Sequence, residues 1–337
     1  MKISVIIPCR NEKNYIEECI TAIFQCELPS GCELQVYVVD GMSDDGTRDV
    51  IEELGRENSK LSLVDNQKQL TPFAFNLGIH AGGKVDFVQI VGARHILSKN
   101  YLMECIKSIQ QNKDIWCAGG KIINAAINPI SERIAAVMSS AFGMGMGNFR
   151  TLEQSGFTDT VTSPMYPYEV FEKIGFFDEN LIRNQDDDFN FRVTQAGGKI
   201  FFIHDISLKY YVRASIAGVR KQFFQYGYWK VFVNQKHGVM TTIRQLFPPL
   251  FVLYLLSFPF IYFFPNWLKV LSLLPIQLYV IGLIFFTLRL TGLKNFLQTA
   301  FLFPLIHLSY GSGYLLGIMD FILLKKNPSD KQKELSR

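Results

Sequence analysis

A nearly uncharged stretch fills the C-terminal part of this chain. Within residues 246–324 only four side chains carry a charge: Lys269, Arg289, Lys294 and Asp320. Three apolar runs lie there, at residues 246–265, 270–288 and 296–324. A helix that spans a membrane needs about 20 apolar residues, whereas a buried core helix needs only about 10 to 14. We therefore expect two domains, a charged one over residues 1–240 and a membrane domain over residues 241–337.

The basic residues around these runs indicate conflicting topologies. Three bases precede the first run, Lys236, His237 and Arg244, and two follow the second run, Arg289 and Lys294. The positive-inside rule makes that side, with the N-terminal domain, the cytoplasm. Three spans would leave the tail, residues 325–337, outside, although its bases exceed its acids by 5 − 2 = 3. We therefore expect a multi-pass protein of the cell membrane with one re-entrant or interfacial run. The third is the most readily broken, because Pro304, Gly311 and Gly313 interrupt or loosen a helix.

Composition excludes several classes of protein. Hydrophobic residues make up 48% of the chain and charged residues 19%, and the formal net charge is +4. These values exclude disordered and fibrous chains, and nucleic-acid binders of this size concentrate a larger excess of bases. No nucleic-acid partner is expected. The cysteines contain no CxxC pair and no metal-ligand spacing, so we interpret them as reduced thiols: Cys9, Cys19, Cys26, Cys32, Cys105 and Cys117.

Strand and helix patterns alternate in the N-terminal domain. Strands are predicted at residues 3–7, 34–39, 87–91 and 199–203, and helices at about 15–24 and 47–55. This order predicts an α/β fold with a mostly parallel sheet covered on both faces. Ligands bind such sheets at the carboxyl ends of the strands, where Pro8 and Asp40 stand.

Two acidic clusters are candidates for chemistry. Asp40 begins a glycine-rich turn, residues 40–47, where its carboxylate could bind a ribose or a base. The alternative is that this segment only forms a turn and that Asp45 or Thr47 caps the next helix.

The second cluster has three adjacent carboxylates, Asp186, Asp187 and Asp188. Mutual repulsion raises the pKa of at least one of them, which suits a general base. The alternative is structural: Asp186 caps a helix and Asp188 pairs with Arg192 one turn on. Both interpretations can hold together.

Several short motifs occur in a characteristic order. They are Ser4-Val5-Ile6-Ile7-Pro8 with Arg10-Asn11-Glu12, Val38-Val39-Asp40-Gly41 with Asp45-Gly46-Thr47, Thr71-Pro72 with Asn76, Asp159-Thr160-Val161, Phe177-Asp178-Glu179, Arg183-Asn184-Gln185-Asp186-Asp187, and Gln222 with Tyr226-Gly227 and Trp229. Together they resemble the membrane-anchored family 2 glycosyltransferases of the GT-A fold, in particular the succinoglycan-type exopolysaccharide branch. The resemblance covers about residues 1–235.

This resemblance implies a Rossmann-like nucleotide-diphospho-sugar transferase domain and a nucleotide-sugar donor, UDP by the family's default. It implies Asp186 as the base of an inverting transfer, with Gln185 where the family has Glu. The implied nucleotide or donor contacts are Pro8, Arg10, Glu12, Asp40, Asn76, Gly92, Arg94 and His95. The implied acceptor contacts are Asp159, Gln185, Asp187, Gln222, Tyr226 and Trp229.

The metal-binding position departs from the family. Relatives carry Asp-x-Asp or Asp-x-His after the central strand to bind Mg²⁺ or Mn²⁺ against the diphosphate, and this chain reads Gly92-Ala93-Arg94-His95. Three explanations stay open. Arg94 and His95 neutralise the diphosphate directly, or His95 or Asp86 holds the metal, or activity has been lost. His204, near the end of a predicted strand, is a further candidate near the site.

The acceptor side is predicted from two segments. Glycines 143, 145 and 147 together with residues 159–166 predict a mobile segment over the acceptor. Residues 216–240 mix bases with aromatic side chains, as an interfacial helix that presents a lipid-linked acceptor does. The polymer synthases' Gln-x-x-Arg-Trp motif is incomplete at Gln222, which favours addition of a single sugar.

The sequence therefore predicts an inverting glycosyltransferase at the cytoplasmic membrane face. It would move one sugar to a polyprenyl-linked glycan during assembly of an exopolysaccharide or a related surface glycan. The alternative is a catalytically degenerate scaffold that binds a nucleotide sugar or a glycan in the same pathway. The substitution of Gly92 and Arg94 for metal ligands motivates it.

Overall fold

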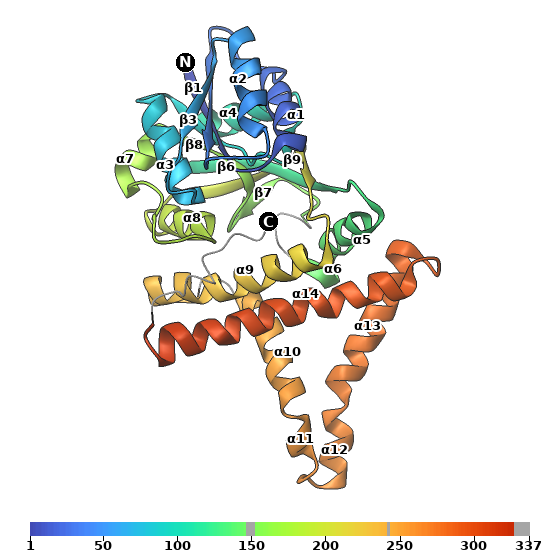
Figure 1. Cartoon of the computed structure of the whole chain (residues 1–337). Helices are drawn as coiled ribbons and strands as arrows, with labels where there is room; N and C mark the ends of the chain where they lie inside the picture. Colours follow the sequence, from blue (N-terminus) through green and yellow to red (C-terminus); the bar gives the residue numbers. More distant parts are fainter. Residues whose placement is uncertain (146–151, 241–242, 327–337) are drawn as a thin grey trace. The chain divides into compact units, whose positions relative to one another are not determined.

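A computed structural model describes residues 1–145, 152–240 and 243–326 (Figure 1). The chain forms two compact units. The first comprises Met1–Ile123 and Gly147–Tyr211, and the second comprises Asn124–Met146 and Val212–Arg337. The predicted domain division at residue 240 stays a prediction.

The first unit is an α/β domain built on one mixed sheet. Its strands are β1 Lys2–Cys9, β2 Glu33–Asp40, β3 Leu61–Asp65, β4 Phe87–Ile90, β5 His95–Leu97, β6 Ile115–Ala125, β7 Gly156–Thr158, β8 Thr162–Pro167 and β9 Lys199–Tyr211. Its helices are α1 Lys13–Phe24, α2 Thr47–Glu57, α3 Thr71–Gly82, α4 Tyr101–Gln111, α7 Tyr168–Ile174 and α8 Gln185–Gln195. The predicted strands and helices and the α/β class are confirmed.

The order of strands explains where the site lies. The sheet runs β3-β2-β1-β4-β8-β6-β9-β5, and β7 pairs with β9. Strands β3, β2, β1 and β4 are parallel neighbours, whereas β8 joins β4 antiparallel. The loops after β1, β2 and β4 therefore lie at one edge of the sheet, where ligands bind in this class of fold.

Side-chain alternation along β1 builds a core on both faces. Val5 and Ile7 pack with α1 and α4 residues in one buried cluster, and Ile6 packs with α3 residues in the other. The second cluster includes Phe189 of α8. Because successive side chains of a strand point to opposite faces, this continuous apolar run suits a sheet that helices cover on both sides.

One predicted mobile segment is part of this sheet. Residues 159–166 include most of β8, whose Met165 and Tyr166 are buried in the centre of the sheet. The expectation of mobility is wrong here, because Ser163, Met165 and Tyr166 are buried in a central strand. Gly143 is also buried, in a short helix, and Gly147 lies outside the described residues.

The second unit is helical. Its elements are α5 Pro129–Met138, α6 Ala141–Met144, α9 Ile216–His237, the 3₁₀ helix η1 Ile243–Leu246, α10 Phe247–Leu256, α11 Phe258–Ile261, α12 Asn266–Ser272, α13 Leu274–Thr291, α14 Phe296–Gly317 and the π-helix η2 Ile318–Leu323. Within the part of the chain that the structure describes, two helical stretches could cross a membrane by length and composition alone, Asn266–Thr291 and Phe296–Leu323. The apolar helix Ile243–Leu256 is shorter.

Two expectations about the apolar runs are wrong. The first run does not form one helix, because α10 ends before Ser257 and α11 starts beside Pro259. A proline lacks the N–H that would continue the preceding helix. The third run, by contrast, continues through Pro304 to Gly317.

Candidate active site

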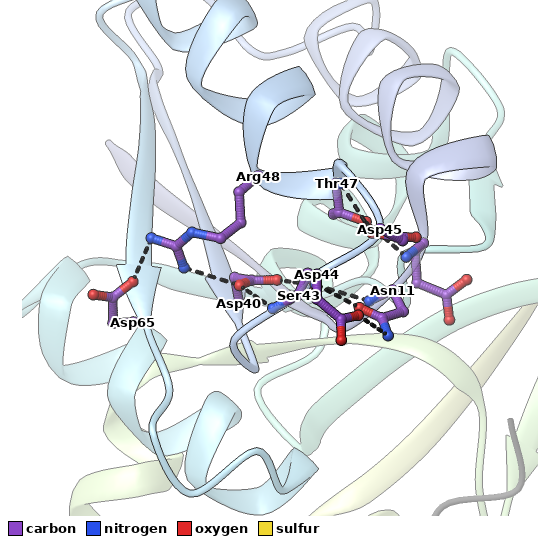
Figure 2. Close-up of polar contacts among 9 residues, drawn as sticks. Asn11, Asp40, Ser43, Asp44, Asp45, Thr47, Arg48 and Asp65 are labelled. Atoms are coloured by element: carbon purple, nitrogen blue, oxygen red, sulfur yellow. Dashed lines mark hydrogen bonds and ion pairs between the residues drawn. The ribbon is translucent and has the colours of Figure 1, made fainter.

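Two loops at the carboxyl edge of the sheet are tied together by hydrogen bonds (Figure 2). Asn11, in the loop after β1, donates its backbone N–H to Ser43 Oγ at 2.8 Å and its side-chain amide to Asp44 Oδ1 at 2.8 Å. The backbone N–H of Glu12 donates to Thr47 Oγ1 at 2.9 Å. The loops that contain Pro8 to Glu12 and Asp40 to Thr47 therefore form one preorganised surface.

Asp40 is buried beneath this surface. Its carboxylate accepts hydrogen bonds from the N–H and the hydroxyl of Ser43 and lies 2.9 Å from Arg48 Nη1. Arg48 Nη2 also lies 2.8 Å from Asp65 Oδ1, and the hydrogen bonds to Asp65 and Asp40 raise the pKa of Arg48. The buried charge is thus neutralised by an arginine that reaches across two strands, as Figure 2 shows. Contact between Asp40 and a nucleotide stays a prediction.

The turn after Asp40 also starts helix α2. The N-cap is Gly46, with φ +90°, so the expectation that Asp45 or Thr47 is the cap is wrong. Asp45 instead reaches past it and accepts the N–H of Thr47 at 2.9 Å and that of Lys13 at 3.2 Å. Burial opposes the charged form of Asp45, but the hydrogen bonds from Thr47 prevail and lower the pKa of this carboxyl.

The segment after β4 carries a cation. Arg94 Nε donates to Glu12 Oε2 at 2.7 Å, and the guanidinium carbon lies 4.6 Å from the centre of the Tyr15 ring. The side chain is 18% exposed. His95 Nδ1 lies 2.8 Å from Ser163 Oγ and accepts the N–H of Gly92 at 3.3 Å. The segment therefore brings Arg94, Glu12 and His95 to the same edge as the two loops.

This donor set does not fit the family's metal site. Among the residues that the structure describes, no group of three or more His, Cys, Asp or Glu side chains could hold a metal ion. Arg94 is a cation paired with Glu12, and Gly92 has no side chain. Asp86 precedes β4, at the opposite end from Gly92, and accepts the N–H of Lys2 at 2.6 Å. The explanation in which Asp86 holds the metal is therefore wrong.

Asn76 has a structural position in α3. Its side-chain amide donates to the carbonyl of Phe177 at 2.9 Å and to Glu179 Oε1 at 3.0 Å, and its oxygen accepts the N–H of Phe177 at 3.0 Å. These bonds hold the segment that leads to α8. Contact between Asn76 and the donor stays a prediction.

Helix α8 carries the acidic cluster. Its N-cap is Asn184, with φ +58°, so the expectation that Asp186 is the cap is wrong. Asp188 is buried, and its Oδ2 lies 3.1 Å from Arg192 Nε, which confirms the expected ion pair. Arg192 also donates to the carbonyls of Ile174 and Phe176 at 2.7 and 2.8 Å. Asp188 thus stabilises the fold.

Asp186 lies in the first turn of α8 and is exposed. The positive end of the helix dipole stabilises a carboxylate there. Beside it, Gln185 is buried, and its Oε1 accepts no hydrogen bond in the described part of the chain. A buried acceptor without a donor costs about 1–3 kcal/mol and often marks a place for a ligand.

A buried network joins α8 to the segment that contains Asp159. Burial raises the pKa of Tyr166, whose hydroxyl donates to Asn190 Oδ1 at 2.9 Å. Asn190 in turn donates to Thr160 Oγ1 at 2.9 Å. The structure thereby places Asp159 one residue from a side chain bound to α8.

The remaining candidates lie on other elements. In the second unit, Gln222 donates to the hydroxyl of Tyr226 at 2.8 Å, and Trp229 is buried against Tyr228 and Phe232. His204, on β9, lies 3.2 Å from Asp205. Arg48 and Ser163 were not predicted from the sequence. The signal for Arg48 was a base eight residues after Asp40. Ser163 gave no signal, because its φ of +46° is visible only in the structure.

Comparison with known proteins settles the family. The sequence model described as "Glycosyl transferase family 2" matches residues 4–175, which is half of the chain. The chain belongs to glycosyl transferase family 2. The predicted enzyme class and the resemblance to this family are confirmed.

Family 2 relatives match most of its length. The "Dolichyl N-acetyl-alpha-D-glucosaminyl phosphate 3-beta-D-2,3-diacetamido-2,3-dideoxy-beta-D-glucuronosyltransferase" of Methanococcus voltae is 30% identical over 94% of this chain and 97% of its own. The "Succinoglycan biosynthesis protein ExoA" of Rhizobium meliloti is 26% identical over 72% of this chain and 73% of its own.

A solved structure supports the fold. The mannosyltransferase PcManGT from Pyrobaculum calidifontis, in complex with GDP-Man and Mn²⁺, superposes with a TM-score of 0.52 at 17% identity. The match covers 70% of this chain and 63% of that one. The GT-A fold expected of this glycosyltransferase is confirmed.

Proposed function

We propose that this family 2 enzyme transfers a single sugar, with inversion, from a nucleotide sugar to a lipid-linked glycan at the cytoplasmic membrane face. The observation that carries the proposal is the match to the M. voltae transferase over nearly all of both chains. The name of that relative specifies a dolichyl phosphate-linked acceptor. The R. meliloti relative favours a role in assembly of an exopolysaccharide or a related surface glycan.

Asp186 is the proposed general base. The acceptor hydroxyl oxygen bonds to the anomeric carbon while its proton passes to the Asp186 carboxylate. The bond from that carbon to the nucleoside diphosphate breaks on the opposite side, with an oxocarbenium-like transition state, so the configuration inverts. Among the three adjacent carboxylates Asp188 is committed to Arg192, whereas Asp186 is exposed at the start of the helix.

Arg94 is the proposed diphosphate contact. The carboxylate of Glu12 accepts the N–H of Arg94 Nε, and the guanidinium group lies over the Tyr15 ring. In the described part of the chain no side chain bonds the two terminal nitrogens of Arg94. A guanidinium with free N–H groups suits phosphate oxygens. Since the residues at this position do not fit a metal site, we assign to Arg94 the charge that balances the leaving diphosphate.

The acceptor contacts remain the predicted ones. The buried, unpaired Oε1 of Gln185 supports a polar contact with an acceptor sugar beside Asp186. Helix α9 carries bases that suit a lipid phosphate or pyrophosphate, among them Arg220 and Lys221. The incomplete synthase motif at Gln222 supports addition of one sugar.

The proposal is tested by transfer assays on the full chain in detergent. A panel of UDP-, GDP- and dTDP-sugars is combined with polyprenyl phosphate- and pyrophosphate-linked sugars, and NMR gives the anomeric configuration of the product. One added sugar of inverted configuration is expected. Retention or multiple additions would contradict the proposed mechanism, and saturable nucleotide binding without turnover across the panel would favour the scaffold.

A further inference from the structure

Helices α9 and α14 touch backbone to backbone. A Cβ added at Gly227 would overlap the carbonyl oxygen of Tyr310, and one at Gly313 would overlap that of Phe224. A Cβ at Gly317 would lie 2.8 Å from the carbonyl oxygen of Tyr228. From Phe224–Gly313 to Tyr228–Gly317 the contacts advance by one turn on both helices, so the helices run parallel and side by side. Small residues permit this distance, which no larger side chain would allow.

Polar contacts continue along the same pair. The Tyr228 hydroxyl donates to Asp320 Oδ2 at 3.0 Å, and Gln235 donates to the carbonyl of Phe321 at 2.8 Å. Asn234 Nδ2 lies 3.2 Å from the Tyr314 hydroxyl. The C-terminal half of α14 and η2 are therefore fixed to α9.

The N-terminal half of α14 is covered by α5 and α6. Arg133 donates to Asn295 Oδ1 at 2.9 Å, at the start of α14. His307 Nε2 lies 3.0 Å from the carbonyl oxygen of Phe142, whose ring centre is 5.1 Å from that of Phe303. The whole length of α14 thus belongs to a layer with α5, α6 and α9.

This layer does not suit hydrocarbon. Helix α9 carries bases and amides throughout: Arg220, Lys221, Gln222, Gln225, Lys230, Asn234, Gln235, Lys236 and His237. Charged side chains in the centre of a bilayer are costly. If α14 crossed the bilayer, the adjoining α9 would enter with it. Consistently, 44% of the most apolar window of Phe296–Leu323 is buried inside the protein, against 6% for Asn266–Thr291.

The helices α10 to α13 form a separate hairpin. Figure 1 shows α10 and α11 leading away from α14 and α12 and α13 returning to it. The arms contact each other where the Tyr254 hydroxyl donates to the carbonyl of Ser272 at 2.6 Å and where the rings of Phe251 and Tyr279 stack at 4.4 Å. The first arm starts at α14, because a Cβ at Gly311 would lie 2.5 Å from the carbonyl oxygen of Pro248.

The surface of the hairpin is apolar. Large hydrophobic side chains on both arms and at the tip are exposed: Phe247, Leu250, Leu253, Leu256, Phe260, Tyr262, Phe263, Trp267, Val270, Leu278, Ile281 and Phe285. Its second arm, Asn266–Thr291, is about 39 Å long at 1.5 Å per residue, which exceeds the hydrocarbon thickness of about 30 Å. Lys269 lies near the tip with its ammonium 5.2 Å from the Tyr262 ring centre. Tyr, Trp and Lys at the tip are typical of a membrane interface.

We propose that the hairpin α10–α13 is the segment that enters the lipid bilayer and that it leaves on the side where it entered. Helix α14 then lies beside α9 at the membrane surface and does not cross. Lys326 then stays on the side of the membrane where the first unit lies, because only residues 212–215 separate Tyr211 from α9. That link spans about 17 Å, less than the bilayer core. The conflict seen in the sequence is thereby removed, because the basic residues 325–337 are then expected on the cytoplasmic side, as the positive-inside rule requires.

The test is labelling of thiols in sealed vesicles of known orientation with a membrane-impermeant maleimide. The native thiol Cys32 is half-buried while the other five are buried, so Cys32 reports the side of the first unit. We expect Lys326→Cys to be labelled from the same side as Cys32, and Phe263→Cys at the tip to be protected from that side. Labelling of Lys326→Cys only from the opposite side would show that α14 crosses. Labelling of Phe263→Cys from the Cys32 side would show that the hairpin does not enter the bilayer.

A matched pair of lysine substitutions tests the same proposal without labels. Phe285 on α13 and Phe301 on α14 are similarly exposed, at 56% and 53%. We expect Phe285→Lys to reduce the carbonate-resistant membrane fraction at least tenfold and Phe301→Lys to change it less than threefold, since a surface lysine can reach water. Equal losses from the two variants, both eluting as monodisperse protein in detergent, would overturn the assignment of α14 to the surface.

Discussion

At the residue scale, Arg94 is the proposed contact that neutralises the donor diphosphate. Its Nε is held by Glu12 and its terminal nitrogens are available for phosphate oxygens. A hydrogen bond to a charged group is worth about 1.5–3 kcal/mol, so Arg94→Ala should weaken nucleoside diphosphate binding by roughly 10- to 100-fold. Arg94→Lys should retain part of the affinity, because lysine keeps the positive charge but cannot bond two phosphate oxygens at once as a guanidinium does.

The measurement is calorimetric binding of the nucleoside diphosphate in EDTA, with Arg56→Ala on the far end of α2 as a control. Binding by the unchanged protein in EDTA is expected. Binding that strictly requires Mg²⁺ or Mn²⁺, or equal affinities for Arg94→Ala and the control, would contradict the role given to Arg94. Neither result would contradict the proposed sugar transfer.

At the element scale, the orientation of α8 depends on Asp188. Removing one partner of a buried ion pair leaves the other uncompensated, at roughly 3 kcal/mol. Asp188→Asn should therefore lower the Tm by several degrees, since Arg192 is only partly exposed. Thermal unfolding in detergent measures this, with Asp187→Asn as the matched control. Equal Tm values for the two variants would show that the pair does not hold the helix.

The close contact of α9 and α14 has its own test. A Cβ at Gly313 overlaps the backbone of α9, whereas neighbouring Ser312 is exposed. Overpacking costs about 1–3 kcal/mol, so Gly313→Ala should lower the Tm while Ser312→Ala changes it little. The expected order of Tm is Ser312→Ala above Gly313→Ala. The reverse order would mean that these helices are not in backbone contact.

Local patterns predicted much of this fold. The apolar runs gave β1 and β2, and the spacing of Asp188 and Arg192 gave their ion pair. What failed depends on partners distant in sequence. Thr162–Pro167 form a central strand only because β4 and β6 pair with them, and Arg48 bridges Asp40 to Asp65 only because β2 and β3 are neighbours. No short window of sequence contains those partners.

At the scale of the whole molecule, the second unit takes a segment from the middle of the chain. Asn124–Met146 groups with Val212–Arg337, and Phe142 packs among the rings of Tyr279, Phe286 and Phe303. This insertion is invisible in the hydropathy pattern, because α5 and α6 are short and their partners lie more than a hundred residues on.

A chain truncated after Tyr211 should therefore aggregate, even though it keeps every strand of the sheet. The loss of α13 and α14 exposes Phe142 and the apolar face of α5, and such patches promote association. Size-exclusion chromatography should show aggregation, relieved when Phe142→Ser is added. A monodisperse truncated chain that unfolds as cooperatively as the full chain would show that the inserted segment does not need its partners.

The central claim is that Asp186 is the base of an inverting sugar transfer. The most direct measurement compares kcat for Asp186→Asn and Asp187→Asn, side by side with their affinity for the nucleotide sugar. General-base catalysis contributes about 100- to 10,000-fold, so Asp186→Asn should lose at least about 100-fold in kcat and keep its donor affinity. Asp187→Asn should lose less than about tenfold. Comparable kcat values for Asp186→Asn and the unchanged protein would contradict the account.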